Sequence, residues 1–204
     1  MAEGTPELID VERVVSGWIN KYVLTYMLPD GSTYRYESMS RKGPEAYRRE
    51  LEARGRGEKV APDAVCVVPI TAEGELLLIR EFRYPVNSWC IAFPAGLVDP
   101  GETTPETLGR ELLEETGYAL RADLGKDAVE ALPQAGLSST GMTDEAVQVV
   151  FAQVEKVADA HPDRGELIKP FLLPIEDVPR FLAENQTPIG TRAQLILEAF
   201  ARRR

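Results

Sequence analysis

The N-terminal part of the chain alternates bulky apolar residues with polar ones, which is the period of a strand with one buried face. The alternation covers residues 11–26, breaks at the turn sequence Pro29-Asp30-Gly31, and resumes over residues 32–38. This pattern predicts an antiparallel hairpin or meander. Residues 41–59 are highly charged, contain glycine and proline, and offer few apolar anchors. We interpret them as a mobile connection between the N-terminal strands and the rest of the chain.

The remainder of the chain mixes apolar runs that predict strands with amphipathic runs that predict helices. The predicted strands are residues 64–70, 75–82, 89–93, 146–154 and 167–173. The predicted helices are residues 103–116, 175–184 and 192–203. The first helix has the clearest signals, because Thr104 precedes Pro105 at the first helical position and Gly117 ends the run.

This order predicts an α/β fold in which helices cover both sides of a mixed sheet. An N-terminal antiparallel β subdomain precedes that sandwich. We place the subdomain and its connection at residues 1–58 and the main domain at residues 59–204.

Charge and composition narrow the partners. The 204 residues carry 33 Asp and Glu against 23 Lys and Arg, a net charge of −10. Such a chain repels a long polyanion, so nucleic acid is not an expected partner. The sequence shows neither a secretory signal nor an apolar run of about 20 residues, so we expect a cytoplasmic protein without a membrane partner.

The residues for several common kinds of chemistry are scarce. His161 is the only histidine, which argues against a zinc site and against a Ser-His-Asp triad. Cys66 and Cys90 lie in predicted strands without metal-binding spacing, and we expect them to be buried free thiols.

The helix predicted at residues 103–116 concentrates negative charge. Glu111 and Glu115 are one turn apart on the same face, and Glu114 lies at the edge of that face. Like charges at this spacing oppose helix formation by a few tenths of a kcal/mol per pair, roughly, and a divalent cation would relieve the repulsion. Carboxylate oxygens are hard ligands of the kind that magnesium selects. A solvated helix face is the ordinary explanation for such glutamates.

The surrounding residues favour the metal. Gly96, five residues, Glu102, seven residues, Arg110-Glu111, two residues, Glu114-Glu115, one residue and Gly117 form a spaced motif. A chance match to this pattern in one chain is well below roughly one in 10^5. The motif resembles the Nudix box, and Tyr118 stands where an aliphatic residue is usual. The chain therefore resembles the Nudix hydrolase superfamily.

The resemblance implies a set of roles. The carboxylates of Glu111, Glu114 and Glu115, with the carbonyl of Ala95, would bind Mg²⁺, with Mn²⁺ as an alternative cation. Glu111 and Glu115 would act in catalysis through that metal. Glu102 and Arg110 would form a fork that holds the loop against the helix.

Similarity to one branch of the superfamily extends outside the box. Residues 81–85, 93–99 and 165–166 resemble segments of the ADP-ribose and ADP-sugar pyrophosphatases, although Thr140 stands where that branch usually has proline. In that branch the N-terminal β subdomain is exchanged between two subunits, so the resemblance implies a homodimer.

The same resemblance suggests the residues that contact substrate. Trp18 and Tyr36 would stack on the base, and Arg41 and Arg83 would bind phosphate or ribose oxygens. The alternatives are that the aromatic rings pack against their own sheet and that the arginines form solvated or intersubunit ion pairs.

The general base is expected outside the box, because the box carboxylates would be occupied by metal. Glu166 matches the family's mobile-loop glutamate, and Glu145 is the second candidate.

These roles predict Mg²⁺-dependent hydrolysis of the pyrophosphate bond in a small nucleotide sugar, with ADP-ribose giving AMP and ribose 5-phosphate. GDP-mannose or another nucleoside diphosphate derivative is the alternative substrate. A non-catalytic ADP-ribose-sensing module is the alternative of another class, and an isomerase on the same fold has no cysteine and histidine pair to support it.

Overall fold

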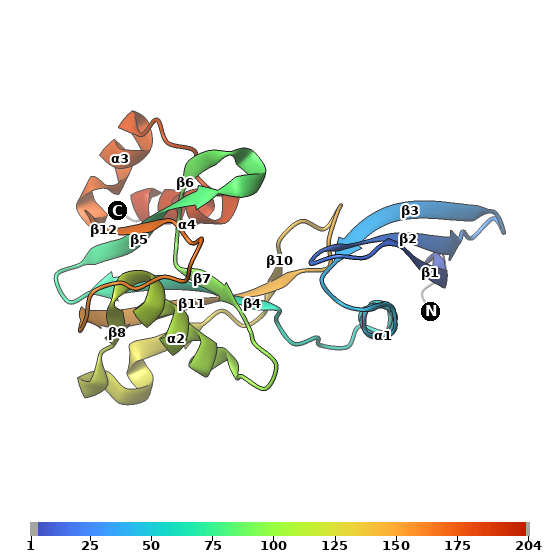
Figure 1. Ribbon diagram of the computed structural model, residues 1–204, viewed down its shortest axis with the longest axis horizontal. Coiled ribbons are helices and arrows are strands. Elements are labelled where there is room, and N and C mark those ends of the chain that lie inside the picture. The colour runs from blue at the N-terminus through green and yellow to red at the C-terminus, as the bar shows by residue number, and fades with distance from the viewer. Residues whose placement is uncertain (1–3, 203–204) are drawn as a thin grey trace. The chain divides into compact units, whose positions relative to one another are not determined.

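The alternating N-terminal residues form a three-stranded antiparallel sheet. In the computed structural model, which describes residues 4–202, strands β1 (Glu7–Val15), β2 (Asn20–Met27) and β3 (Thr33–Ser40) pair in that order (Figure 1). Val11 and Leu24 are opposite each other in the register and both are buried. The predicted meander is therefore confirmed, and its alternation reflects one face that packs and one that meets solvent.

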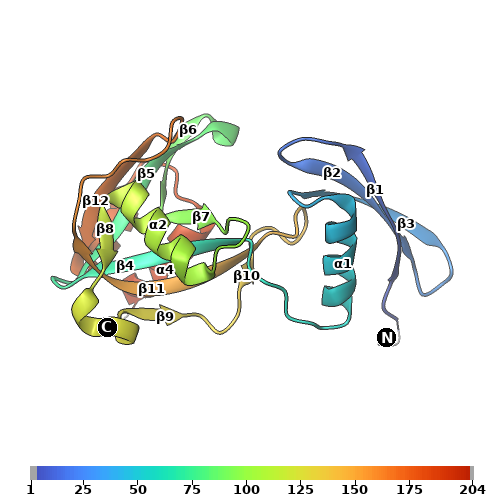
Figure 2. The same cartoon turned by 60° about the horizontal axis from the view of Figure 1, so that its bottom comes forward.

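The segment predicted to be a mobile connection contains a helix instead. Helix α1 (Pro44–Gly55) begins with proline in its first turn and lies against one face of the three-stranded sheet (Figure 2). Tyr47 is 1% exposed and packs on Tyr22 with ring centroids 4.7 Å apart. The prediction of a mobile connection was wrong. Two apolar residues one turn apart, Tyr47 and Leu51, are enough to pack the helix on the sheet, and charged pairs such as Glu50–Arg54 stabilise its solvent side.

The chain divides into two compact units. The first comprises the described residues up to Pro62 together with the loop Ala135–Val147. Within this loop, β10 (Gly136–Leu137) pairs with the first residues of β11 (Ala146–Lys156). The second unit comprises Asp63–Gln134 and the described residues from Gln148 onward.

The second unit is built on a sheet whose main strands lie in the order β11-β4-β5-β12. Strands β4 (Ala64–Thr71), β5 (Glu75–Arg83) and β12 (Ile168–Pro174) supply its centre and one edge. Short strands extend it: β6 (Ser88–Ala92) pairs with β5, β7 (Ala95–Leu97) with β4, and β8 (Tyr118–Leu120) and β9 (Val129–Ala131) with β11. These pairings place β7, which precedes the acidic helix, beside the most buried strand of the sheet.

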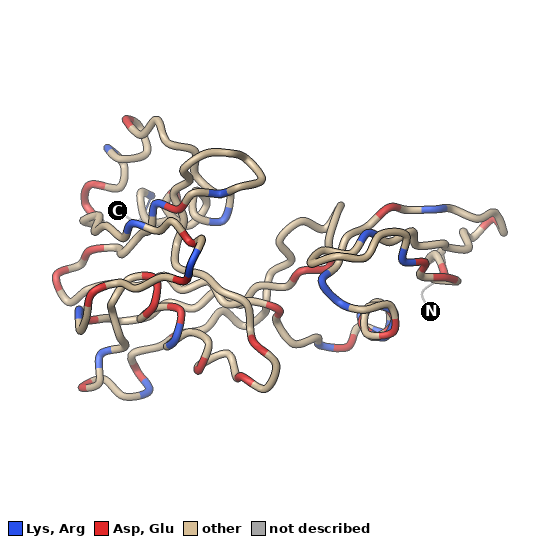
Figure 3. The backbone as a smooth tube through the Cα atoms, viewed as in Figure 1, with Lys and Arg blue, Asp and Glu red and all other residues tan. Residues whose placement is uncertain are grey.

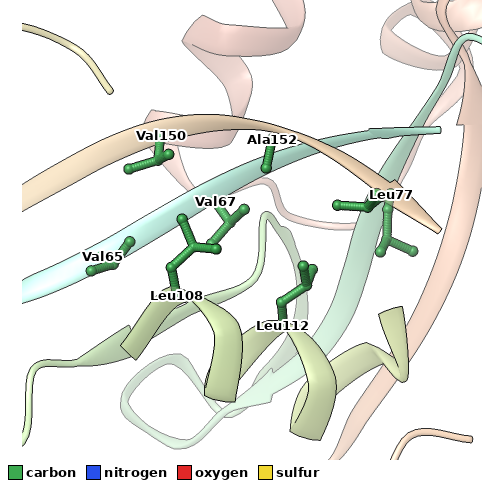
Figure 4. Packing of buried hydrophobic residues seen from close by; sticks show 8 residues of the cluster. Val65, Val67, Leu77, Leu108, Leu112, Val150 and Ala152 are labelled. Carbon is green, nitrogen blue, oxygen red and sulfur yellow. The ribbon is translucent and has the colours of Figure 1, made fainter. Parts of the chain in front are cut away.

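Helices pack on both sides of this sheet. Val150 and Ala152 of β11 face Leu108 and Leu112 of α2 (Thr104–Thr116), as Figure 4 shows. Phe151 between them faces the other way and meets Phe200 of α4 (Thr191–Arg202) at 6.4 Å between ring centroids. The predicted α/β sandwich is confirmed, and the period of two along β11 explains why one strand serves two helical layers.

Most predicted elements are present with boundaries shifted by one or two residues. The helix predicted at 175–184 is a 3-10 turn, Ile175–Asp177, followed by α3 (Val178–Glu184). The helix predicted at 192–203 corresponds to α4, and residue 203 lies outside the described residues. The strands β7 to β10 were not predicted, because two or three residues are too few to show a period. Two further 3-10 turns, Tyr84–Val86 and Ala122–Ala128, were likewise not predicted.

Cys66 and Cys90 are buried free thiols, as predicted. Across residues 4–202, no helix is both long and apolar enough to span a membrane. Acidic and basic positions are interspersed along both units rather than gathered into one basic tract (Figure 3).

Candidate functional site

The acidic helix α2 has firmly defined ends. Thr103 and Glu106 form a capping box, in which the Glu106 carboxylate accepts hydrogen bonds from both the backbone and the hydroxyl of Thr103. The cap therefore lies one residue before the predicted Thr104. At the other end, Gly117 has φ +72°, and a side chain there would lie 2.2 Å from the carbonyl oxygen of Ala158. Together these ends fix the rotation of the helix and hence the face on which its glutamates lie.

Arg110 ties the preceding loop to this helix. Its Nε and Nη2 atoms donate to the two carboxylate oxygens of Glu102, at 2.8 and 3.0 Å. The Thr107 hydroxyl donates to the same carboxylate at 2.7 Å. The hydrogen bonds from Arg110 and Thr107 lower the pKa of Glu102 to about 2. The predicted fork is confirmed, and it locks the loop that contains Gly96 and Glu102.

The same guanidinium also borders the carboxylate patch. Its Nη1 atom lies 2.8 Å from Glu111 Oε1 and 3.3 Å from Glu114 Oε2. With Asp99 at 3.7 Å, one cation thus contacts four acidic side chains on α2 and its loop, which reduces their mutual repulsion. Burial nevertheless raises the pKa of Glu111 above its ordinary value.

Glu115 is the most deeply buried carboxylate of the helix, with 4% of the residue exposed. Its Oε2 atom accepts a hydrogen bond from the backbone N–H of Ala95 at 3.2 Å. Burial, followed by the charges of Glu111 and Glu81, raises its pKa to about 9. A carboxyl group in this environment holds a proton at neutral pH unless a cation replaces it.

Gly96 gives Glu111 the room that it needs. A Cβ atom built on Gly96 would lie 1.8 Å from Glu111 Oε1, far inside any allowed contact. The glycine therefore lets the backbone of β7 pass directly against a carboxylate of α2. This contact brings the backbone of Ala95 and Gly96 into the acidic patch.

Glu81, near the end of β5, is a site residue to which sequence reasoning assigned no role. Its Oε2 atom is buried and has no hydrogen-bond donor in suitable geometry, although Arg83 Nη2 lies 2.8 Å away as an ion pair. Burial raises the pKa of Glu81. The available signal was an acidic residue two positions after an apolar run, since Leu76 to Ile79 are all buried and only Arg80 intervenes.

Glu166 lies in the loop between β11 and β12 and is exposed. The loop turns at Gly165, where φ is +99°, and the Tyr84 hydroxyl donates to the Gly165 carbonyl at 2.9 Å. The charge of Glu166 contributes to raising the pKa values of Glu81, Glu111 and Glu115. The structure therefore places the predicted base in the electrostatic field of the predicted metal ligands.

The donor set of this patch fits a hard divalent cation. It offers carboxylate oxygens on α2 and the buried Oε2 atom of Glu81, and the Ala95 N–H holds one oxygen of Glu115 in place. Within residues 4–202, no three acidic, histidine or cysteine side chains form a ready-made cage. Magnesium suits such a site, because it commonly takes one or two carboxylates and completes its shell with water and phosphate oxygens.

The remaining predicted site residues belong to the first unit. Trp18, in the turn between β1 and β2, is 77% exposed. Tyr36 donates to the carbonyl of Gly141 at 2.7 Å and borders an apolar cavity of about 380 Å³. Arg41 forms an ion pair with Glu145. The other Glu145 oxygen accepts from Ser138 at 2.7 Å, so the second candidate for the base is engaged within this unit.

Comparisons with known proteins place the chain in a family. The family model for the NUDIX domain matches residues 60–193. An ADP-sugar pyrophosphatase of Mus musculus is 35% identical over 120 residues, 54% of this chain and 48% of that protein. An ADP-ribose pyrophosphatase of Bacillus subtilis (strain 168) is 31% identical over 127 residues, 61% of this chain and 65% of that protein. The matches thus span about half to two thirds of these relatives.

A crystal structure of an ADP compounds hydrolase shares the fold. It superposes with a TM-score of 0.73 and covers 99% of this chain and 95% of its own, at 22% sequence identity. The family match covers the α2 carboxylates, the Arg110–Glu102 fork and the Glu166 loop together. The chain belongs to the Nudix family.

Proposed function

We propose that the protein hydrolyses the pyrophosphate bond of a nucleoside diphosphate sugar with Mg²⁺, and that ADP-ribose is converted to AMP and ribose 5-phosphate. The observation that carries the proposal is the acidic patch, in which buried Glu115 is bonded to the backbone of Ala95, half-buried Glu111 lies against Gly96, and both are in the field of Glu166. The names of the relatives, ADP-sugar and ADP-ribose pyrophosphatase, support the substrate class.

In this proposal Glu111, Glu114, Glu115 and the Ala95 carbonyl hold the cation, and Mn²⁺ can replace Mg²⁺. When bound, the cation neutralises the diphosphate and lowers the pKa of the attacking water. Glu115 would hold the cation as a carboxylate, so its proton would pass to solvent, and the Arg110–Glu102 fork keeps the helix and loop in register.

Glu166 is the proposed general base. It takes a proton from the water whose oxygen bonds to one phosphorus, and the bond between that phosphorus and the bridging oxygen breaks. Its exposed position on a glycine-containing loop suits a group that approaches only when substrate is bound. Glu145 is less suitable, because Arg41 and Ser138 already engage its two oxygens.

Substrate contacts are proposed for both units. Trp18 stacks on the adenine, and its large exposed ring is available for that contact. Tyr36 contributes a second aromatic surface beside the apolar cavity. Arg41 and Arg83 bind phosphate or ribose oxygens by exchanging their carboxylate partners, Glu145 and Glu81, for the substrate.

We further propose a homodimer in which residues 1–58 exchange between subunits and residues 59–204 form the hydrolase domain. Large exposed apolar residues in the first unit, such as Trp18, Ile19 and Tyr34, support an interface there. Light scattering on the purified chain should give twice the mass of 22.6 kDa. A monomer at micromolar concentration would contradict the dimer and leave the α2 site unaffected.

The direct test is product analysis with Mg²⁺ on a panel of ADP-ribose, ADP-glucose, GDP-mannose, NADH and 8-oxo-dGDP. We expect ADP-ribose to be cleaved fastest, with AMP and ribose 5-phosphate as products. Faster cleavage of GDP-mannose would refute ADP-ribose as the preferred substrate and would still support hydrolysis of a pyrophosphate bond. Binding of ADP-ribose without cleavage of any compound would replace the hydrolysis of ADP-ribose with a sensing role.

Glu115→Gln should separate metal binding from folding. A folded-state pKa of about 9, above the ordinary 4.5, means that the folded protein loses stability as pH rises from about 4.5 to about 9. In EDTA the variant should therefore melt at least about 3 °C above the parent at pH 8, with a smaller difference at pH 5. Mg²⁺ should raise the melting temperature of the parent only, and turnover of the variant should fall at least about a hundredfold.

Glu130→Gln is the matched control for that experiment, because Glu130 is an exposed carboxylate on β9. It should respond to Mg²⁺ as the parent does. Equal stabilisation of the Glu115→Gln protein by Mg²⁺, or near-normal turnover, would refute the metal assignment.

Glu166→Gln should lower kcat by about a hundredfold or more, because the water loses its proton acceptor. The affinity of the Glu166→Gln protein for Mg²⁺, measured by calorimetry, should stay within about twofold of the parent, because Glu166 is not one of the proposed metal ligands. Asp163→Asn, in the same loop, controls for the loss of one negative charge and should keep kcat. Weakened metal binding in the Glu166→Gln protein would make Glu166 a ligand instead.

Gly96→Ala should weaken Mg²⁺ binding at least about tenfold, because the new methyl group would displace the Glu111 carboxylate. Gly109→Ala, on the helix that carries Glu111, is the control, since a Cβ atom there meets nothing within 4 Å. That control should keep activity and melt at or above the temperature of the parent. Unchanged metal affinity in the Gly96→Ala protein would show that Glu111 is not held against this glycine.

A further inference from the structure

One buried amide joins the turn that contains Trp18 to the strand end that contains Arg41. Asn20, the first residue of β2, is 5% exposed and lies opposite Ser40 in the register with β3. Its Oδ1 atom accepts from the Gly17 N–H at 3.4 Å. Its Nδ2 atom lies 3.3, 3.5 and 3.2 Å from the carbonyl oxygens of Ser40, Arg41 and Lys42.

Only an amide side chain, in one orientation, can form hydrogen bonds with all of these neighbours. Three carbonyl oxygens converge on one side, where two N–H protons are shared among them, and a single N–H donor lies on the other. A carboxylate would place negative oxygen against carbonyl oxygen, and an apolar side chain would leave buried polar groups unpaired.

Further contacts hold the Lys42 side of this cluster. The Tyr22 hydroxyl donates to the Lys42 carbonyl at 2.6 Å. The Lys42 ammonium contacts Asp144 at 2.9 Å and Glu50 at 3.0 Å, and both carboxylates are largely buried. The backbone at Arg41 is therefore fixed on the side of Lys42 as well as by Asn20.

The position of Trp18 depends on the same amide. With 77% of the residue exposed, its packing contacts are few, so the backbone of its turn decides where the ring stands. The bond from the adjacent Gly17 to Asn20 is one of the contacts that set this backbone. One side chain thus constrains both an aromatic and a cationic candidate for substrate contact.

We propose that Asn20 is a positioning residue for substrate binding, which presents Trp18 and Arg41 in a fixed relation to the nucleotide. This inference rests on the proposed function, in which those two residues contact the substrate. Asn20 touches no reacting atom, so it governs affinity and leaves the chemical step unchanged.

The test is steady-state hydrolysis of ADP-ribose by the full chain with Mg²⁺, together with calorimetric binding of its non-hydrolysable α,β-methylene analogue. Asn20→Ala should raise KM and the Kd of the analogue by roughly three- to tenfold, the size of one or two lost hydrogen bonds. Its kcat should remain within about twofold of the parent.

A double-mutant cycle separates positioning from general loss of stability. In an Arg41→Ala background, Asn20→Ala should raise KM by less than it does in the parent, because part of its effect passes through Arg41. Tyr47→Phe, which removes a bond to Ser38 in the same unit, is the stability control and should leave KM unchanged.

Tyr22→Phe gives a second variant if Asn20→Ala fails to fold. It removes the hydroxyl that bonds the Lys42 carbonyl and interacts with Arg13, and it leaves the bond from Gly17 to Asn20 intact, so it should raise KM through Arg41 and show no coupling to Trp18→Ala. Full additivity of Asn20→Ala with both Arg41→Ala and Trp18→Ala would overturn the proposal. So would an unchanged KM in the Asn20→Ala protein, or, if that protein does not fold, an unchanged KM in the Tyr22→Phe protein.

Failure of the proposed function would look different. In that case Arg41→Ala and Trp18→Ala would themselves leave KM for ADP-ribose unchanged. If those two variants raise KM and Asn20→Ala does not, the substrate contacts stand and the positioning role is wrong.

Discussion

The burial of several like-charged carboxylates in one small patch is the constraint on which the rest of this structure depends. Glu115 is nearly inaccessible, and its burial, followed by the charges of Glu111 and Glu81, raises its pKa to about 9. A folded chain tolerates this only where other groups offset the cost of desolvation and repulsion. Here the offsets are the Arg110 guanidinium, the Ala95 N–H and a retained proton.

The two faces of α2 explain how the fold supports such a patch. Leu108 and Leu112 enter the core with Val65 and Val67, so apolar burial holds the helix on the sheet. On an adjoining side of the helix, Glu111 and Glu114 contact Arg110. The capping box and Gly117 fix both ends of the helix. Packing of Leu108 and Leu112 in the core therefore also fixes where the carboxylates of the helix lie. Stability and the proposed cation binding thus depend on one helix.

The elements that were predicted correctly have long periodic runs of apolar residues or clear capping residues at their ends. The N-terminal antiparallel sheet, the central strands of the sandwich and α2 were predictable, because alternation, apolar runs and capping residues act locally. The turn that divides the first alternating stretch into β1 and β2 was not predicted. Helix α1 was missed because its apolar stripe is narrow and its charged residues suggested a connection. The cap fell on Thr103 rather than Thr104, since the reciprocal contact with Glu106 decides between two equivalent threonines.

The site was predictable where a motif fixes spacing and not where the fold brings distant residues together. Glu111, Glu114, Glu115 and the Arg110–Glu102 fork follow from the spacing of the box. The buried Oε2 atom of Glu81 and the cluster around Asn20 depend on strand pairing, which no local pattern reveals.

Proton release on Mg²⁺ binding measures the central claim, that a cation replaces the proton of Glu115, most directly. Calorimetric titration with Mg²⁺ at pH 7.5, in buffers of different ionisation enthalpy, should show about one proton released per cation as Glu115 becomes a ligand; binding without proton release would contradict the account.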